Sequence, residues 1–123
     1  MKTIRYYAVT KDGQSFNIEL KLKRDFSKKE VLEAREALEK KVMKDYKDKG
    51  YDLDRLEMLV TVPSKISKAK LNEIGYDIAS VWGAECTSIK TYENLVEFNC
   101  IEDGERFKTY MSYDEIREDY HIN

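Results

Sequence analysis

Hydrophobic and polar residues alternate on both sides of Asp12-Gly13, in the stretch TIRYYAVTKDGQSFNIELKL. Such alternation predicts two β-strands, and the Asp-Gly pair between them predicts a hairpin. A three-residue loop that ends at Gly13 pairs Val9 with Ser15, whereas a two-residue turn would scatter the apolar side chains over both faces. We therefore predict a bulged hairpin. Its apolar face consists of Ile4, Tyr6, Ala8, Phe16, Ile18 and Leu20.

The next stretch, residues 26–50, has the pattern of one long amphipathic helix. Ser27 and Glu30 match a capping box, which predicts where the helix begins, and Gly50 predicts where it ends. Between these signals the apolar residues recur at helical spacing. They are Val31, Ala34, Leu38, Val42 and Tyr46.

A strand and a second helix follow. The run RLEMLVTV, residues 55–62, alternates and stops at Pro63, so it predicts a strand with Leu56, Met58, Val60 and Val62 facing inward. Ser67 is the expected N-cap of a helix over residues 67–82, and Gly83 is its expected end. The apolar face of this helix would be Leu71, Ile74, Ile78 and Trp82.

The last third of the chain predicts three strands and a short helix. Turns near Glu93-Asn94 and at Asp103-Gly104 separate the strands. Two-residue turns pair Ile89 with Phe98 and Cys100 with Phe107. In that register Cys86 does not lie opposite Cys100, so we predict two free thiols. Ser112 and Glu115 match a second capping box, which predicts that a final helix begins there.

These elements together predict an α+β fold in a single domain over residues 1–123. The expected architecture is a mainly antiparallel sheet of about six strands, with two hairpins at Asp-Gly turns. One long helix and two shorter helices would pack on this sheet.

Composition narrows the class of protein. The chain is 41% hydrophobic and 37% charged, which is typical of a polar globular protein. No apolar run approaches the ~18 residues of a membrane span, and no signal-peptide pattern follows Lys2. We expect a cytoplasmic protein without membrane contact, in which Cys86 and Cys100 stay reduced.

Residues typical of catalysis or metal binding are scarce. The one histidine, His121, lies close to the C-terminus, where chains usually fray. The two cysteines are fourteen residues apart, which is not metal-ligand spacing, and no glycine-rich phosphate loop occurs. We therefore predict a non-enzymatic protein with no catalytic residue, no metal and no cofactor.

Charge is distributed unevenly along the chain. Residues 1–50 hold fourteen Lys and Arg against nine Asp and Glu, whereas residues 51–123 hold eight against fifteen. Acids and tyrosines gather near the end, and such a surface suits a protein partner with a basic surface, for example a nucleic-acid-binding one. The predicted partner-binding residues are Glu93, Glu97, Glu102, Asp103, Glu105, Tyr110, Tyr113, Glu118, Asp119 and Tyr120. In composition alone, the chain resembles phage-borne inhibitors of host defence.

The alternative hypothesis is a nucleic-acid-binding module that uses the lysine-rich long helix. A stripe of lysines is what phosphate neutralisation requires. Asp45 and Asp48 interrupt the stripe, however, and lysines near the end of a helix are also favoured by the helix dipole. The lysines are Lys28, Lys29, Lys40, Lys41, Lys44, Lys47 and Lys49.

Overall fold

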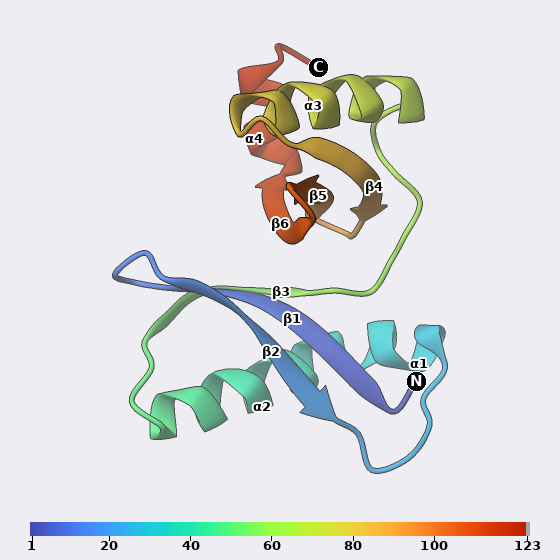
Figure 1. Ribbon diagram of the computed structural model, residues 1–123. Coiled ribbons are helices and arrows are strands. Elements are labelled where there is room, and N and C mark those ends of the chain that lie inside the picture. The colour runs from blue at the N-terminus through green and yellow to red at the C-terminus, as the bar shows by residue number, and fades with distance from the viewer. Residues whose placement is uncertain (123) are drawn as a thin grey trace. The chain divides into compact units, whose positions relative to one another are not determined.

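The computed structural model describes residues 1–122 and has an α+β fold of four helices and six strands (Figure 1). The predicted fold class and strand number are confirmed, but the strands form two three-stranded antiparallel sheets rather than one. The chain divides into two compact units, an N-terminal unit, Met1–Val60, and a C-terminal unit that begins at Thr61. Each unit has a hydrophobic core of its own. The single domain expected from the sequence stays a prediction.

The sheet of the N-terminal unit contains β1 (Thr3–Thr10), β2 (Ser15–Lys21) and β3 (Leu53–Met58), in the order β2-β1-β3. The first hairpin has the predicted register, with Val9 opposite Ser15. Gly13 has a φ of 90°, the left-handed conformation that the three-residue loop requires. The predicted apolar face therefore forms one side of this unit's core, because the register sets every side chain's face.

Two helices, α1 (Lys28–Glu33) and α2 (Arg35–Asp48), replace the single long helix that the sequence predicts. Ala34, with φ −90° and ψ 6°, separates them. The capping box is confirmed: Glu30 N–H donates to Ser27 Oγ, and Ser27 N–H donates to Glu30 Oε1, each at 3.1 Å. The Ser27 and Glu30 pair was therefore sufficient to predict where α1 begins.

Strand β3 is shorter than predicted and begins earlier, at Leu53. Val60 remains buried in the core of the N-terminal unit although it lies beyond the strand. Val62 N–H instead donates to Thr91 O of the C-terminal unit's sheet, at 3.0 Å. The alternation seen in residues 55–62 thus continues across the boundary between the two units.

The C-terminal unit contains β4 (Glu85–Thr91), β5 (Leu95–Glu102) and β6 (Glu105–Ser112), in the order β4-β5-β6. Both predicted two-residue turns are confirmed, since Ile89 lies opposite Phe98 and Cys100 opposite Phe107. Helices α3 (Lys68–Val81) and α4 (Tyr113–Asp119) contribute to one core with β5. Ser67 and Ser112 cap these helices as predicted.

Two predictions in this unit are wrong. A bulge between Cys86 and Ser88 shifts the register by one residue, so Cys86 lies directly opposite Cys100, although both thiols are free. Trp82 does not belong to the buried face of α3. It is the C-cap residue and 59% exposed, and the centre of its ring lies 6.5 Å from that of Phe107.

Within residues 1–122, no helix is long and apolar enough to span a membrane.

Candidate functional site

The predicted partner-binding residues do not form one surface. Glu102, Asp103 and Glu105 are exposed around the β5–β6 turn, whereas Glu93 is half-buried in the β4–β5 turn. These turns lie at opposite ends of the eight-residue β5. Because a strand rises about 3.3 Å per residue, they are roughly 23 Å apart. A partner that contacts one of these ends need not reach the other.

Glu97 is not an exposed acid but a buried one, with 0% of its surface accessible. Tyr92 and Tyr110 donate hydroxyl hydrogen bonds to Oε1, at 3.2 and 2.9 Å, and Asn99 Nδ2 donates to Oε2 at 2.9 Å. Lys108 Nζ lies 3.8 Å from Oε1. Glu97 and Tyr110 therefore belong to a structural network. Because Glu97 is buried, it is not part of a surface that a partner could contact.

The charge of this buried carboxylate is maintained by its partners. Burial raises the pKa of Glu97, but the hydrogen bonds from Asn99 and Tyr110 and the positive charge of Lys108 outweigh that effect. The net result is a pKa below the ordinary value of a glutamate. Glu97 is thus a buried anion at neutral pH, satisfied by hydrogen bonds as such groups must be.

Tyr113 is the second predicted binding residue that is buried rather than on the surface, since only 3% of it is exposed. Its hydroxyl accepts a hydrogen bond from the backbone N–H of Lys65 at 3.3 Å. Its ring packs in the core of the C-terminal unit. Tyr113 therefore ties the start of α4 to the loop before α3, which is a structural role.

Tyr120 and its neighbours form the part of the prediction that the structure brings together. Burial raises the pKa of Tyr120, and the negative charges of Asp77, Asp119 and Glu73 raise it further. Asp77 and Glu73 come from α3, whereas Asp119 comes from α4. We call this surface the acidic helix face. It consists of Glu73, Asp77, Asp119 and Tyr120, and Glu118 is an exposed neighbour of Asp119 in the sequence.

Sequence reasoning missed Glu73 and Asp77. Their spacing of four residues places them on one side of a helix, which was visible in the sequence. Their proximity to Tyr120 depends on how α3 and α4 pack, which was not. Lys70 is the basic residue of this region, with Nζ 3.4 Å from Glu73 and 5.9 Å from the centre of the Tyr120 ring.

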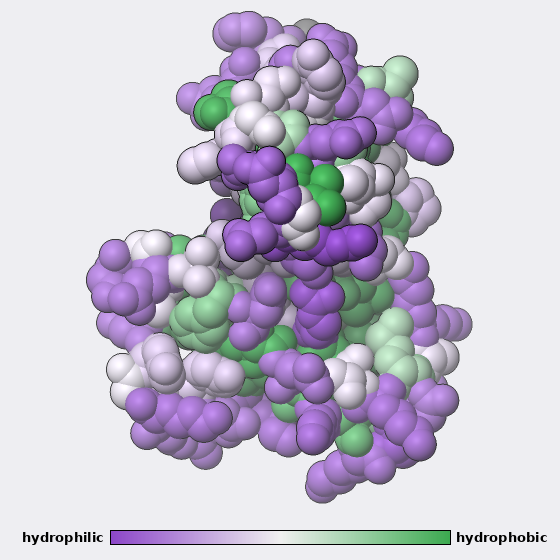
Figure 2. Space-filling view, viewed as in Figure 1, coloured by the Kyte–Doolittle hydropathy of each residue, from purple (hydrophilic) through white to green (hydrophobic). Residues whose placement is uncertain are grey.

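Charge also differs between the two units. Residues 1–60 hold fifteen basic and twelve acidic side chains, and residues 61–123 hold seven basic and twelve acidic. Hydrophilic residues dominate the face seen in Figure 2. The C-terminal unit is therefore the acidic part of the chain.

The lysine-rich helix is exposed, but its charge is mixed. Lys40 Nζ lies 3.4 Å from Glu36, and Lys49 Nζ lies 4.8 Å from the centre of the Tyr46 ring. Asp45 is exposed among the lysines. The exposed lysines of α2 are Lys40, Lys41, Lys44 and Lys47, with Lys49 as the C-cap residue.

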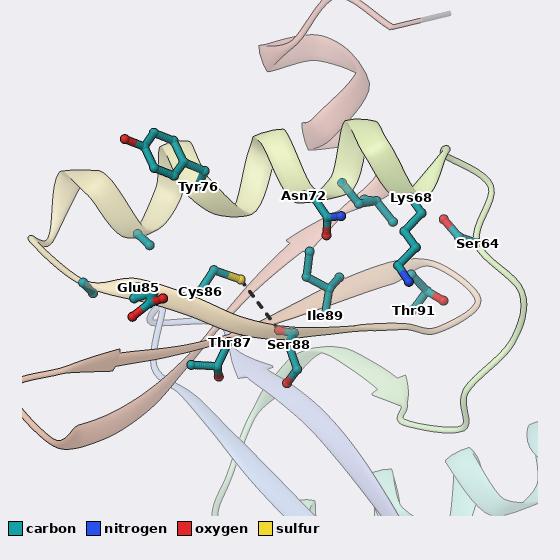
Figure 3. Close-up of a pocket in the computed structure, with 13 residues that line it drawn as sticks. Ser64, Lys68, Asn72, Tyr76, Glu85, Cys86, Thr87, Ser88, Ile89 and Thr91 are labelled. Carbon is teal, nitrogen blue, oxygen red and sulfur yellow. Dashed lines mark hydrogen bonds between the residues drawn. The ribbon is translucent and has the colours of Figure 1, made fainter.

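A groove lies between α3 and β4, with a volume of about 900 Å³ (Figure 3). Lys68 and Asn72 extend from α3 toward the strand, and Ile89 points back toward the helix. Leu71 and Cys86 add apolar surface to its lining. We call this feature the edge groove.

Among the residues that the structure describes, no group of three or more His, Cys, Asp or Glu side chains is arranged to bind a metal ion. His121 is exposed beyond the end of α4. The chain matches no protein-family model, no curated protein and no solved structure.

Proposed function

We propose that this protein is a non-enzymatic binding protein whose acidic helix face binds a basic surface of a partner protein. The observation that carries the proposal is that carboxylates from α3 and α4 lie close enough to Tyr120 to raise its pKa. Lys70 Nζ, 3.4 Å from Glu73 and 5.9 Å from the centre of the Tyr120 ring, marks where the two helices come together. Like charges held close together repel one another. A cationic partner relieves that repulsion, so part of its binding free energy comes from the arrangement of the acids.

The chemistry of this face suits a protein interface. Tyrosine supplies a rigid ring with a polar tip, and such residues are enriched where proteins meet. Glu118 and Asp119 are exposed and lie beyond the first turn of α4, so the helix dipole does not explain them. Their charges remain available to steer a basic partner.

The partner's basic surface would be one that otherwise binds nucleic acid, such as the channel of a nuclease. In that case the protein would act as an inhibitor, because its carboxylates would occupy the positions of phosphates. The composition that resembles phage-borne inhibitors is in keeping with this function. We propose that it acts in the cytoplasm.

Charge reversal tests the proposal. The bait is the whole protein, and proteins captured from an extract of its host are identified and then purified. Asp77→Lys with Asp119→Lys should lower the association rate with a captured partner by roughly tenfold at low salt, since rim charges act mainly on association. The difference in association rate between the variant and the unmodified protein should shrink as salt rises, because salt screens the electrostatic steering of both forms.

Lys44→Glu with Lys47→Glu is the matched control and should leave this association rate unchanged. An unaltered rate for the Asp77 and Asp119 variant would refute the acidic helix face as the binding surface. Retarded migration of DNA or RNA by the unmodified protein, lost on reversal of Lys44 and Lys47, would instead favour the nucleic-acid-binding alternative.

A further inference from the structure

Strand β4 lies at an edge of its sheet, and within residues 1–122 it has a strand neighbour on one side only. The outer side is already used at one end, where Val62 N–H donates to Thr91 O at 3.0 Å and Thr91 Oγ1 donates to Val62 O at 2.8 Å. An antiparallel ladder alternates, so residues two apart direct their backbone groups to the same side. The N–H and C=O of Ile89 therefore point to the outer edge as well.

This edge opens into the edge groove. Helix α3 runs alongside β4, and the side chains of Thr87 and Ser88 point away from it, whereas Ile89 points toward it (Figure 3). The volume of about 900 Å³ falls within the ~300–1,000 Å³ of typical ligand sites. An extended chain in this groove could pair with the backbone of β4 and place alternate side chains against Ile89 and Leu71.

The two ends of the edge groove carry opposite charges. Lys68 lies at the end formed by Ser64 and Thr91, and Glu85 lies at the other end, where β4 begins. Within the described residues, the structure gives neither Lys68 nor Glu85 an ion-pair partner. A ligand that complements both ends has an acidic group near Lys68, apolar residues in the middle and a basic group near Glu85.

We propose that the edge groove binds an extended peptide segment of a partner protein, which adds to the sheet as a fourth strand beside β4. Backbone hydrogen bonds of this kind supply affinity, and pockets for alternate side chains supply specificity. The opposite charges of Lys68 and Glu85 at the two ends of the groove favour a short peptide with complementary ends as its occupant. The site differs from the acidic helix face and does not depend on it.

A displayed library of ten-residue random peptides, selected against the full-length protein, tests the proposal. Enriched peptides should contain an alternating apolar core with an acidic residue toward one end and a basic residue toward the other. A synthetic peptide from the selection should slow hydrogen exchange at the amide of Ile89 by at least roughly tenfold, because that N–H becomes bonded.

Substitutions locate the binding. Asn72→Trp fills the groove from an exposed position on α3 and should weaken the peptide at least roughly tenfold, whereas Ser80→Trp, exposed on α3 outside the groove lining, should not. Lys68→Glu should weaken an acidic-ended peptide, and a peptide with that acid changed to lysine should bind the variant better. Thermal unfolding confirms that each variant is folded.

Several outcomes would overturn the inference. One is a selection that yields no peptide with the expected charges, and another is a bound peptide that protects amides outside β4. Unchanged affinity in both Asn72→Trp and Lys68→Glu would exclude the groove. Self-association through β4, seen as a dimer by sedimentation and abolished by Asn72→Trp, would show that the edge groove binds a second copy of this chain and not a partner's peptide.

Discussion

Gly75 provides a sharp test of how α3 packs on the sheet. A Cβ at this position would lie 2.9 Å from Cys86 Sγ, 3.3 Å from Ile89 Cδ1 and 3.4 Å from Phe98 Cδ1. The first distance is shorter than real Cβ contacts allow. The absence of a side chain at residue 75 therefore lets α3 approach β4 and β5 closely.

The effect of Gly75→Ala is a balance of two terms. Alanine is favoured over glycine inside a helix by about 1 kcal/mol. Overpacking of a tight core costs about 1–3 kcal/mol, because neighbours must shift or leave their rotamers. With a 2.9 Å contact to relieve, we expect overpacking to exceed the helix preference, and the free energy of unfolding to fall by about 1 kcal/mol.

A double-mutant cycle isolates the contact with Cys86. Cys86→Ala removes the Sγ atom and by itself should cost about 1 kcal/mol through lost burial. In that background the shortest contact of the new methyl group of Gly75→Ala is gone. The remaining 3.3 Å contact requires Ile89 Cδ1, the end of a flexible side chain, to move only slightly, and the 3.4 Å contact with Phe98 is ordinary. The double variant should therefore be more stable than Cys86→Ala alone, with a coupling energy of about 1–2 kcal/mol.

Urea denaturation measures each corner of the cycle. The fluorescence of Trp82, the only tryptophan, reports on the C-terminal unit, and far-ultraviolet circular dichroism reports on the whole chain. A Gly75→Ala variant that is more stable than the wild type would refute the close approach. Strictly additive effects of the two substitutions would refute the contact with Cys86.

Three further predictions follow from particular contacts. Ser27→Ala and Ser112→Ala should each lower the free energy of unfolding by about 1 kcal/mol, and unchanged urea midpoints would mean that these serines do not cap helices. Since the folded pKa of Glu97 is depressed, its contribution to stability is present above the unfolded value and lost as pH falls through the folded value. Glu97→Gln should therefore flatten the acid limb of a stability–pH profile, and an identical limb would contradict this. Thiol titration of the unfolded, unreduced protein should find both Cys86 and Cys100 free, whereas no free thiol would reveal a bridge.

Features that depend on a few neighbouring residues were predictable from the sequence. The helix starts at Ser27 and Ser112 were predicted correctly, because each serine hydroxyl accepts a hydrogen bond from the backbone N–H three residues on. The full capping box is confirmed at Ser27, whereas at Ser112 the side chain of Glu115 accepts from the serine hydroxyl. The hairpin loop at Gly13 was also correct, because only one loop length places all apolar side chains on one face. The α+β class follows from the order of such elements.

Predictions about the candidate site fared differently, because exposure depends on partners far along the chain. Glu97 resembles its acidic neighbours in the sequence, yet the hydroxyl of Tyr110, thirteen residues away, binds it in a buried network. Tyr120 was among the predicted binding residues, but the carboxylates Glu73 and Asp77 lie near it only because α3 and α4 share one core. No local sequence pattern specifies such contacts between residues that are distant in the chain.

The sequence by itself determined where most helices and strands of this protein begin and end, because turns and caps are short-range interactions. Tertiary structure alone decided that six strands form two sheets, that a bulge brings Cys86 opposite Cys100, and that Gly75 lets α3 lie close to β4. The physical reason is common to all three. Each depends on whether surfaces distant in sequence can pack without voids or overlap, and the alternation of residue types does not specify that.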